Sequence, residues 1–187
     1  MGRLTHGTAP GFTYFVTTKA WQNQAVFQVR ENAEILVGCL AHYRGQGLYL
    51  LHEFVVMPNH LHLILTPAVN ASLEKAMQLI KGRSSHDIHA RRGGKGGKAQ
   101  IWHSGFHEES IRNQGDYSRK AEYIQMNPVR AHLVERPEDW PYGSIAKRVE
   151  LDPTPERLKR SSSGAKAPFL AEAGMSELKL RPPKDPE

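Results

Sequence analysis

The most constraining feature of this sequence is the segment Leu48–Thr66, which predicts a β-hairpin. Its first half, Leu48–Met57, is aliphatic and aromatic enough to form a buried strand. Pro58-Asn59 is a typical turn sequence, and His60–Thr66 predicts the returning strand. The chain is therefore expected to contain an antiparallel sheet built around this hairpin.

The returning strand carries two histidines, His60 and His62, on the same face. Successive side chains of a strand point to opposite faces, so the leucines that alternate with the histidines face a core. Imidazoles two residues apart, about 7 Å along the strand, can both donate a neutral nitrogen to one divalent ion. The pair indicates a metal site, although such histidines also occur on the half-solvated face of an ordinary sheet. Both interpretations stay open at this point.

The periodicity of the remaining sequence predicts an α+β domain. We expect strands at 13–18 and 100–106 and helices at 26–44, 72–91 and 115–127, the last stopped by Pro128. With the hairpin, this order is that of a ferredoxin-like sandwich, an antiparallel sheet with helices on one face. The histidine strand would lie near the centre of that sheet.

Composition limits the number of domains and the environment of the protein. A chain of 187 residues fits one core, and the composition changes near Glu150, so we expect a domain at 1–149 and a poorly ordered tail at 150–187. The single cysteine, Cys39, excludes an intramolecular disulfide and suits a reducing cytosol. No segment resembles a signal peptide or approaches the roughly 20 apolar residues that cross a bilayer. We expect a soluble, cytoplasmic protein without a membrane partner.

The chain is basic, with a formal net charge of +6, which favours a polyanionic partner. Basic residues gather in the distal part of the second predicted helix, in the glycine-lysine run after it, and in the third. They are candidates for contacts with a phosphate backbone, and a solvated surface is the alternative. The candidates are Lys81, Arg83, Arg91, Arg92, Lys95, Lys98, Arg119 and Lys120.

Tyr123 and Asn127 lie four residues apart, on one face of the third predicted helix. An amide oxygen is a ligand for a hard ion such as Mg²⁺ or Mn²⁺, and a tyrosine hydroxyl one turn away can be directed at a group held by that ion. A free phenol has a pKa of about 10, so it needs a metal that polarises and orients the phosphate it attacks. Taken singly, each residue is more often structural. Together with His60 and His62 they form a set suited to phosphodiester cleavage.

Four blocks of the sequence, in the same order, resemble a known family. They are MPNHLHLIL, MQLIKGRSSH, IWHSGFHEESIRN and YIQMNPVRAHLVERPEDWPYGS. These blocks closely resemble those of the REP-associated tyrosine transposases, a branch of the HUH single-tyrosine transposases that acts on repeated extragenic palindromes (REPs). The resemblance implies a ferredoxin-like HUH domain with the HUH motif on a central strand. It implies metal ligation by His60, His62 and Asn127, with Mg²⁺ or Mn²⁺ as the ion, and Tyr123 as the nucleophile.

The resemblance also implies a reaction and a partner. The family's tyrosine attacks a phosphodiester of single-stranded DNA near a hairpin, which leaves a 5′-phosphotyrosine bond and a free 3′-OH. The implied partner is single-stranded DNA with hairpin or palindromic structure, and we expect a monomer, with a dimer as the alternative.

Two other functions are open on the sequence alone. A zinc-dependent hydrolase would combine His60 and His62 with His103, His107 or Cys39. A non-catalytic single-stranded nucleic-acid-binding module would present aromatic side chains of the same kind of sheet to the strand.

Overall fold

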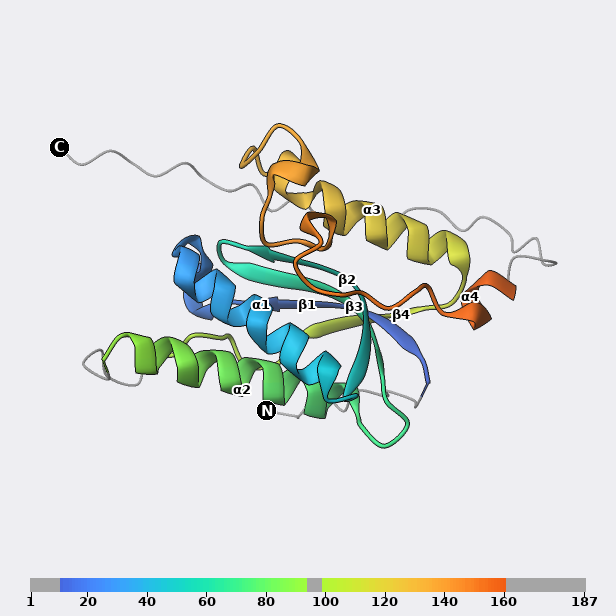
Figure 1. Cartoon of the computed structure of the whole chain (residues 1–187), viewed down its shortest axis with the longest axis horizontal. Helices are drawn as coiled ribbons and strands as arrows, with labels where there is room; N and C mark the ends of the chain where they lie inside the picture. Colours follow the sequence, from blue (N-terminus) through green and yellow to red (C-terminus); the bar gives the residue numbers. More distant parts are fainter. Residues whose placement is uncertain (1–10, 94–98, 161–187) are drawn as a thin grey trace.

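The computed structural model describes residues 11–93 and 99–160 (Figure 1). Its centre is a four-stranded antiparallel sheet with the strand order β2-β3-β1-β4. The strands are β1 (Thr13–Lys19), β2 (Tyr49–Met57), β3 (His60–Pro67) and β4 (His107–Ile111). The predicted hairpin is confirmed as β2 and β3, and the histidine strand β3 is an inner strand of the sheet, as expected.

Two helices cover one face of the sheet (Figure 1). They are α1 (Arg30–Gly45) and α2 (Leu73–Arg91). The leucines Leu61, Leu63 and Leu65 of β3 are fully buried in the core cluster that these helices form with the sheet. The predicted alternation of β3 and the ferredoxin-like α+β architecture are therefore confirmed.

The third helix, α3 (Gln114–Arg130), lies over the opposite face of the sheet, away from α1 and α2 (Figure 1). This face also carries large apolar side chains, Phe15 of β1 and Ile64 of β3, which need cover from water. Ala121 and Ile124 of α3 pack against them in a second buried cluster. The prediction that the helices lie on one face is therefore wrong, because α3 covers the face of His60 and His62, where the apolar side chains also need cover from water.

The predicted strand at 100–106 and the predicted end of the third helix at Pro128 are wrong. Residues 100–106 form no strand; they contain one isolated bridge, Ala20 with Trp102, and the strand begins at His107. The apolar residues of this segment are instead buried beside α2, where the Trp102 indole donates a 3.0 Å hydrogen bond to the Ser84 hydroxyl. Helix α3 does not stop at Pro128 but continues to Arg130. A proline in the last turn removes one N–H, and the helix ends within three residues of it.

The starts of α2 and α1 differ in their local chemistry. Ser72 caps α2, since its hydroxyl accepts a 3.1 Å hydrogen bond from the Lys75 N–H. Residues Val26–Gln28 form a 3₁₀ helix rather than the first turn of α1. The remaining short elements are three 3₁₀ helices, Trp21–Asn23, Pro137–Asp139 and Ser144–Ala146, and helix α4, Glu156–Arg160.

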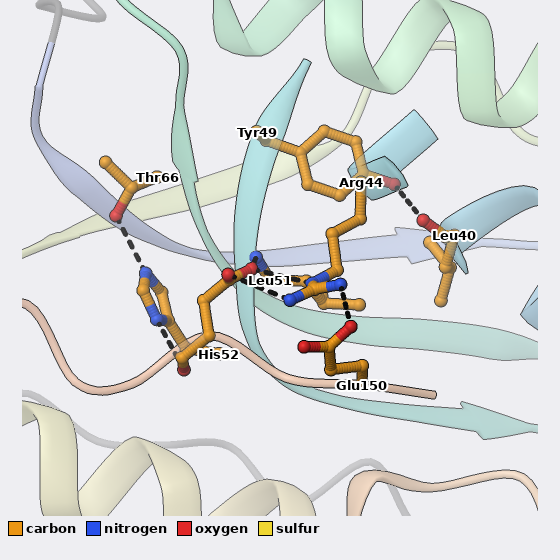
Figure 2. Close-up of polar contacts among 8 residues, drawn as sticks. Leu40, Arg44, Tyr49, Leu51, His52, Thr66 and Glu150 are labelled. Carbon is orange, nitrogen blue, oxygen red and sulfur yellow. Dashed lines mark hydrogen bonds and ion pairs between the residues drawn. The ribbon is translucent and has the colours of Figure 1, made fainter. Parts of the chain in front are cut away.

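Residues 150–160, the first part of the predicted tail, pack against the sheet. The Arg44 guanidinium donates hydrogen bonds of 2.9 and 3.0 Å to the two Asp152 carboxylate oxygens, and the Leu51 N–H donates one of 2.8 Å to the same carboxylate. Figure 2 shows Arg44 also reaching Glu150, which is bonded at 3.0 Å but largely exposed. The end of α1, the start of β2 and the C-terminal segment are therefore joined at one carboxylate.

His52 makes a second link between the sheet and this segment (Figure 2). Its Nε2 lies 2.9 Å from the Thr66 hydroxyl and its Nδ1 lies 3.2 Å from the Asp152 carbonyl oxygen. Burial lowers the pKa of His52, so the ring is neutral and serves both bonds at pH 7. Leu158 of α4 is buried in the cluster under α3. The domain boundary at residue 149 stays a prediction, and residues 161–187 lie outside the described residues.

In the part of the chain that the structure describes, no helix is both long enough and apolar enough to cross a membrane.

Replacing Asp152 by alanine is expected to lower the free energy of unfolding by about 2–3 kcal/mol, because it leaves the largely buried Arg44 guanidinium with only the exposed Glu150 as a partner and removes the acceptor of the Leu51 N–H. Urea unfolding measures this change. Glu150→Ala is the matched control: it removes an exposed carboxylate from the same guanidinium and is expected to cost at most about 1 kcal/mol. Equal losses in the two variants would contradict the role given to Asp152.

Candidate active site

The histidine pair lies on the face of β3 that α3 covers. The ring centroids of His60 and His62 are 4.7 Å apart. Nδ1 of His62 lies 2.8 Å from the Thr17 hydroxyl of β1, and Nδ1 of His60 lies 2.6 Å from the Asn59 side-chain oxygen. These contacts use one nitrogen of each ring and orient the other toward the site, as metal-binding histidines require.

The second nitrogen of the His62 ring is available for a ligand. His62 Nε2 is buried and has no hydrogen-bond partner among the described residues. The His60 side chain has a hydrogen bond with Asn127 of α3. A buried imidazole nitrogen without a partner is unusual and calls for an explanation such as a bound ion.

Both histidines are neutral. Burial, with the nearby charge of Lys19 as a smaller cause, lowers the pKa of His60 to about 4. Burial also holds the pKa of His62 well below its ordinary value, with smaller effects from His60, Lys120 and Lys19. A neutral imidazole is the form that coordinates a metal, so the environment keeps both rings ready as ligands.

Helix α3 brings Tyr123 and Asn127 to the histidines. The Tyr123 ring lies 5.2 Å from the His62 ring and 6.0 Å from the Phe15 ring, both in edge-on contact. The Arg130 guanidinium lies 5.7 Å from the centre of the Tyr123 ring. Asn127 is buried, one turn from Tyr123. The four residues selected from the sequence are therefore gathered in one place, and their chemical roles stay predictions.

A buried carboxylate attaches α3 to the sheet next to Tyr123. Glu53 of β2 accepts a 3.0 Å hydrogen bond from the Gln125 side-chain amide and another from the Ser144 hydroxyl. Burial raises the pKa of Glu53. Neither Glu53 nor Thr17 was selected from the sequence. A lone carboxylate in an apolar strand was the signal for Glu53, whereas the pairing of Thr17 with His62 depends on a register that one sequence does not reveal.

The donor set combines two imidazole nitrogens with one amide oxygen. Imidazoles suit zinc as well as other divalent metals, whereas the Asn127 side-chain oxygen is a ligand of the type that Mg²⁺ or Mn²⁺ takes. Among residues 11–93 and 99–160, no three His, Cys, Asp or Glu side chains gather in a way that could hold a metal. Cys39 lies in α1, across the sheet from His62, and burial raises the pKa of its thiol to about 11. The zinc alternative thus lacks a third ligand of the type it needs.

The basic residues predicted to contact DNA divide between the two faces of the sheet. On the face of the histidines, Lys120 forms a 2.7 Å ion pair with Glu109 and lies 4.5 Å from the centre of the Phe15 ring. Arg119 pairs with Asp116. Arg119 and Lys120 both line a cavity of about 530 Å³ between β4 and α3.

Three of the other basic candidates, Lys81, Arg83 and Arg91, belong to α2 and lie across the sheet from the histidines. The Lys81 ammonium donates hydrogen bonds of 2.8 and 2.6 Å to two carbonyl oxygens, and burial lowers its pKa to about 8. Arg83 pairs with Asp87 at 2.6 Å, and Arg91 donates to the Asn32 side chain at 3.2 Å. Arg92 is exposed at the end of α2, and Lys95 and Lys98 lie outside the described residues.

Comparisons with known proteins agree with this geometry. The family model described as "Transposase IS200 like" matches residues 17–127, a range that contains all four site residues. The REP-associated tyrosine transposase of Escherichia coli K12 is 31% identical over 140 residues, which are 74% of this chain and 79% of that protein. A solved structure of a REP-associated tyrosine transposase bound to a REP hairpin has the same fold, with a TM-score of 0.64 and 23% identity over 79% of this chain and 84% of that chain. The chain therefore belongs to the IS200-like transposases, as a tyrosine transposase of the REP-associated type.

Proposed function

We propose that this protein is a metal-dependent single-stranded DNA endonuclease and strand transferase that uses Tyr123 as its nucleophile. The observation that carries the proposal is the 5.2 Å contact between the rings of Tyr123 and His62. His62 Nε2 is also the buried nitrogen that has no partner among the described residues. A phenol therefore lies beside the donor that a metal would use.

His60, His62 and Asn127 would hold Mg²⁺ or Mn²⁺. When bound, such an ion would draw charge from a phosphate oxygen and orient the phosphate toward the attacking group. Two features of the chain favour metal binding by the histidines. Burial keeps the imidazoles neutral, and Thr17 and Asn59 fix their orientation.

The reaction of Tyr123 is a transesterification. The phenolic oxygen forms a bond to phosphorus while the bond from phosphorus to the 3′ oxygen breaks. The phenolic proton passes to solvent, and the 3′ oxygen takes up a proton and leaves as a free 3′-OH. The product is a 5′-phosphotyrosine. Because the bond energy is kept in this linkage, the 3′-OH of another DNA end can reverse the reaction without ATP.

Single-stranded DNA with a REP-type hairpin is the partner that we propose. The related protein of known structure is bound to a REP hairpin, and the E. coli relative is named for the same element. Arg119 and Lys120 line the cavity next to the site, so we assign them to the backbone of the cleaved strand. The basic residues of α2 remain candidates for contacts further from the scissile phosphate.

We expect the active protein to be a monomer. The packing of helix α3 on the sheet of its own chain supports a site in which the histidine pair and Tyr123 come from a single molecule. The Glu53–Gln125 hydrogen bond further attaches the tyrosine helix to that sheet.

Tyr123→Phe is expected to abolish a covalent protein–DNA adduct, because phenylalanine keeps the ring contacts and loses the nucleophilic oxygen. The adduct is measured on denaturing gels after incubation with Mn²⁺ and labelled single-stranded oligonucleotides that carry a palindromic hairpin. Tyr117→Phe is the matched control: it removes a hydroxyl from the same helix, at a buried position whose side chain bonds Thr154. An adduct that survives in Tyr123→Phe would refute this nucleophile, and binding without any wild-type adduct would favour the non-catalytic binding module.

His62→Ala is expected to weaken Mn²⁺ binding at least about tenfold, since even the loss of a group that only orients a ligand costs that much. Titration calorimetry of the DNA-free protein measures the affinity, and removal of the metal with EDTA should stop adduct formation by the wild type. His86→Ala is the control, because His86 is an exposed histidine on α2. Unchanged Mn²⁺ affinity in His62→Ala would rule out this metal site.

A further inference from the structure

Lys19 lies beside the histidine pair, although no motif pointed to it. It is the last residue of β1 and is directly opposite His60 in the register of β1 and β3. Two residues earlier, Thr17 is opposite His62, and the 2.8 Å contact between their side chains shows that such pairs share a face. Lys19 therefore extends from the same face as His60 and His62.

The backbone around Lys19 is held in place on both sides. The Ala20 N–H donates a 2.8 Å hydrogen bond to the Asn59 carbonyl oxygen, and the Lys19 carbonyl oxygen accepts one of 2.9 Å from the His103 N–H. Directly opposite residues of an antiparallel pair have Cβ atoms about 4.5–5.5 Å apart. The Lys19 side chain thus starts next to the His60 side chain, at a strand end whose backbone is hydrogen-bonded on both sides.

Lys19 differs from Lys120 and Arg119 in that it has no anionic partner among the described residues. Lys120 pairs with Glu109 and Arg119 pairs with Asp116. The Lys19 side chain is exposed, so its ammonium is open to a substrate that approaches this face.

An unpaired ammonium next to a site for a divalent cation is unfavourable in isolation, because the two positive charges repel each other. The arrangement becomes favourable when an anion lies between them. The substrate of the proposed reaction is such an anion: each phosphodiester carries one negative charge, and charge on its oxygens must be stabilised in the transition state.

We propose that Lys19 is a catalytic residue that binds a non-bridging oxygen of the scissile phosphate beside the metal site. The inference rests on the proposed function, since it concerns the same phosphate. It adds a protein cation to the two histidines, the asparagine and the tyrosine.

The test compares Lys19→Ala and Lys19→Arg with the wild type in two measurements. The first is the single-turnover rate of adduct formation at saturating hairpin oligonucleotide and Mn²⁺. Lys19→Ala is expected to be slower by about 100-fold, the usual cost of losing one preorganised donor, and Lys19→Arg, which keeps the charge, should recover part of the rate. The control, Lys75→Ala, removes an exposed lysine of α2 across the sheet and should react like the wild type.

The second measurement is the Mn²⁺ affinity of the protein without DNA. Removing a lysine with only a structural role would not improve this affinity. Loss of the repelling charge should leave Lys19→Ala with equal or severalfold tighter Mn²⁺ binding.

A wild-type adduct together with a Lys19→Ala rate within about threefold of it would overturn the inference and leave the proposed function intact. A slow Lys19→Ala variant that also loses Mn²⁺ affinity would overturn it too, because the lysine would then support the metal site rather than the phosphate. If the wild type itself forms no adduct, the proposed function fails and the inference fails with it.

Discussion

The whole site depends on strand β3 being buried on both faces. Leu61, Leu63 and Leu65 are fully buried under α1 and α2, and each such burial is worth about 1.5–3 kcal/mol. A slip of one residue in register would turn the leucines outward and the histidines into the core. Packing of the leucines therefore determines which face the histidines occupy, and the metal-binding chemistry follows from ordinary core formation.

The packing of helix α3 over strand β3 makes His60 and His62 candidate ligands. By covering His62 it removes water from the imidazole, which lowers the pKa and leaves Nε2 without a partner among the described residues. The same helix carries Tyr123 and Asn127, so the desolvation of the proposed ligands and the position of the proposed nucleophile have one structural cause. Glu53 and the apolar cluster around Ile124 keep this helix on the sheet.

Local patterns in the sequence were sufficient for most of the fold and for the four central residues. Alternation in β3 separated leucines from histidines, and the spacing of four placed Tyr123 and Asn127 on one helix face. Long-range features were not accessible in this way. The strand expected at 100–106 lies at 107–111, because the apolar residues that resemble a strand are buried beside α2 instead. The face chosen by α3, and the partners Thr17, Lys19 and Glu53, depend on strand register and helix docking.

The most direct test of the central claim is the position of the metal in a crystal of the Tyr123→Phe variant soaked in Mn²⁺, located by anomalous scattering. The account predicts a single peak coordinated by one nitrogen each of His60 and His62 and by the side-chain oxygen of Asn127. A peak elsewhere, or a fully occupied metal site to which Asn127 contributes no ligand, would contradict the assembly of the site from β3 and α3.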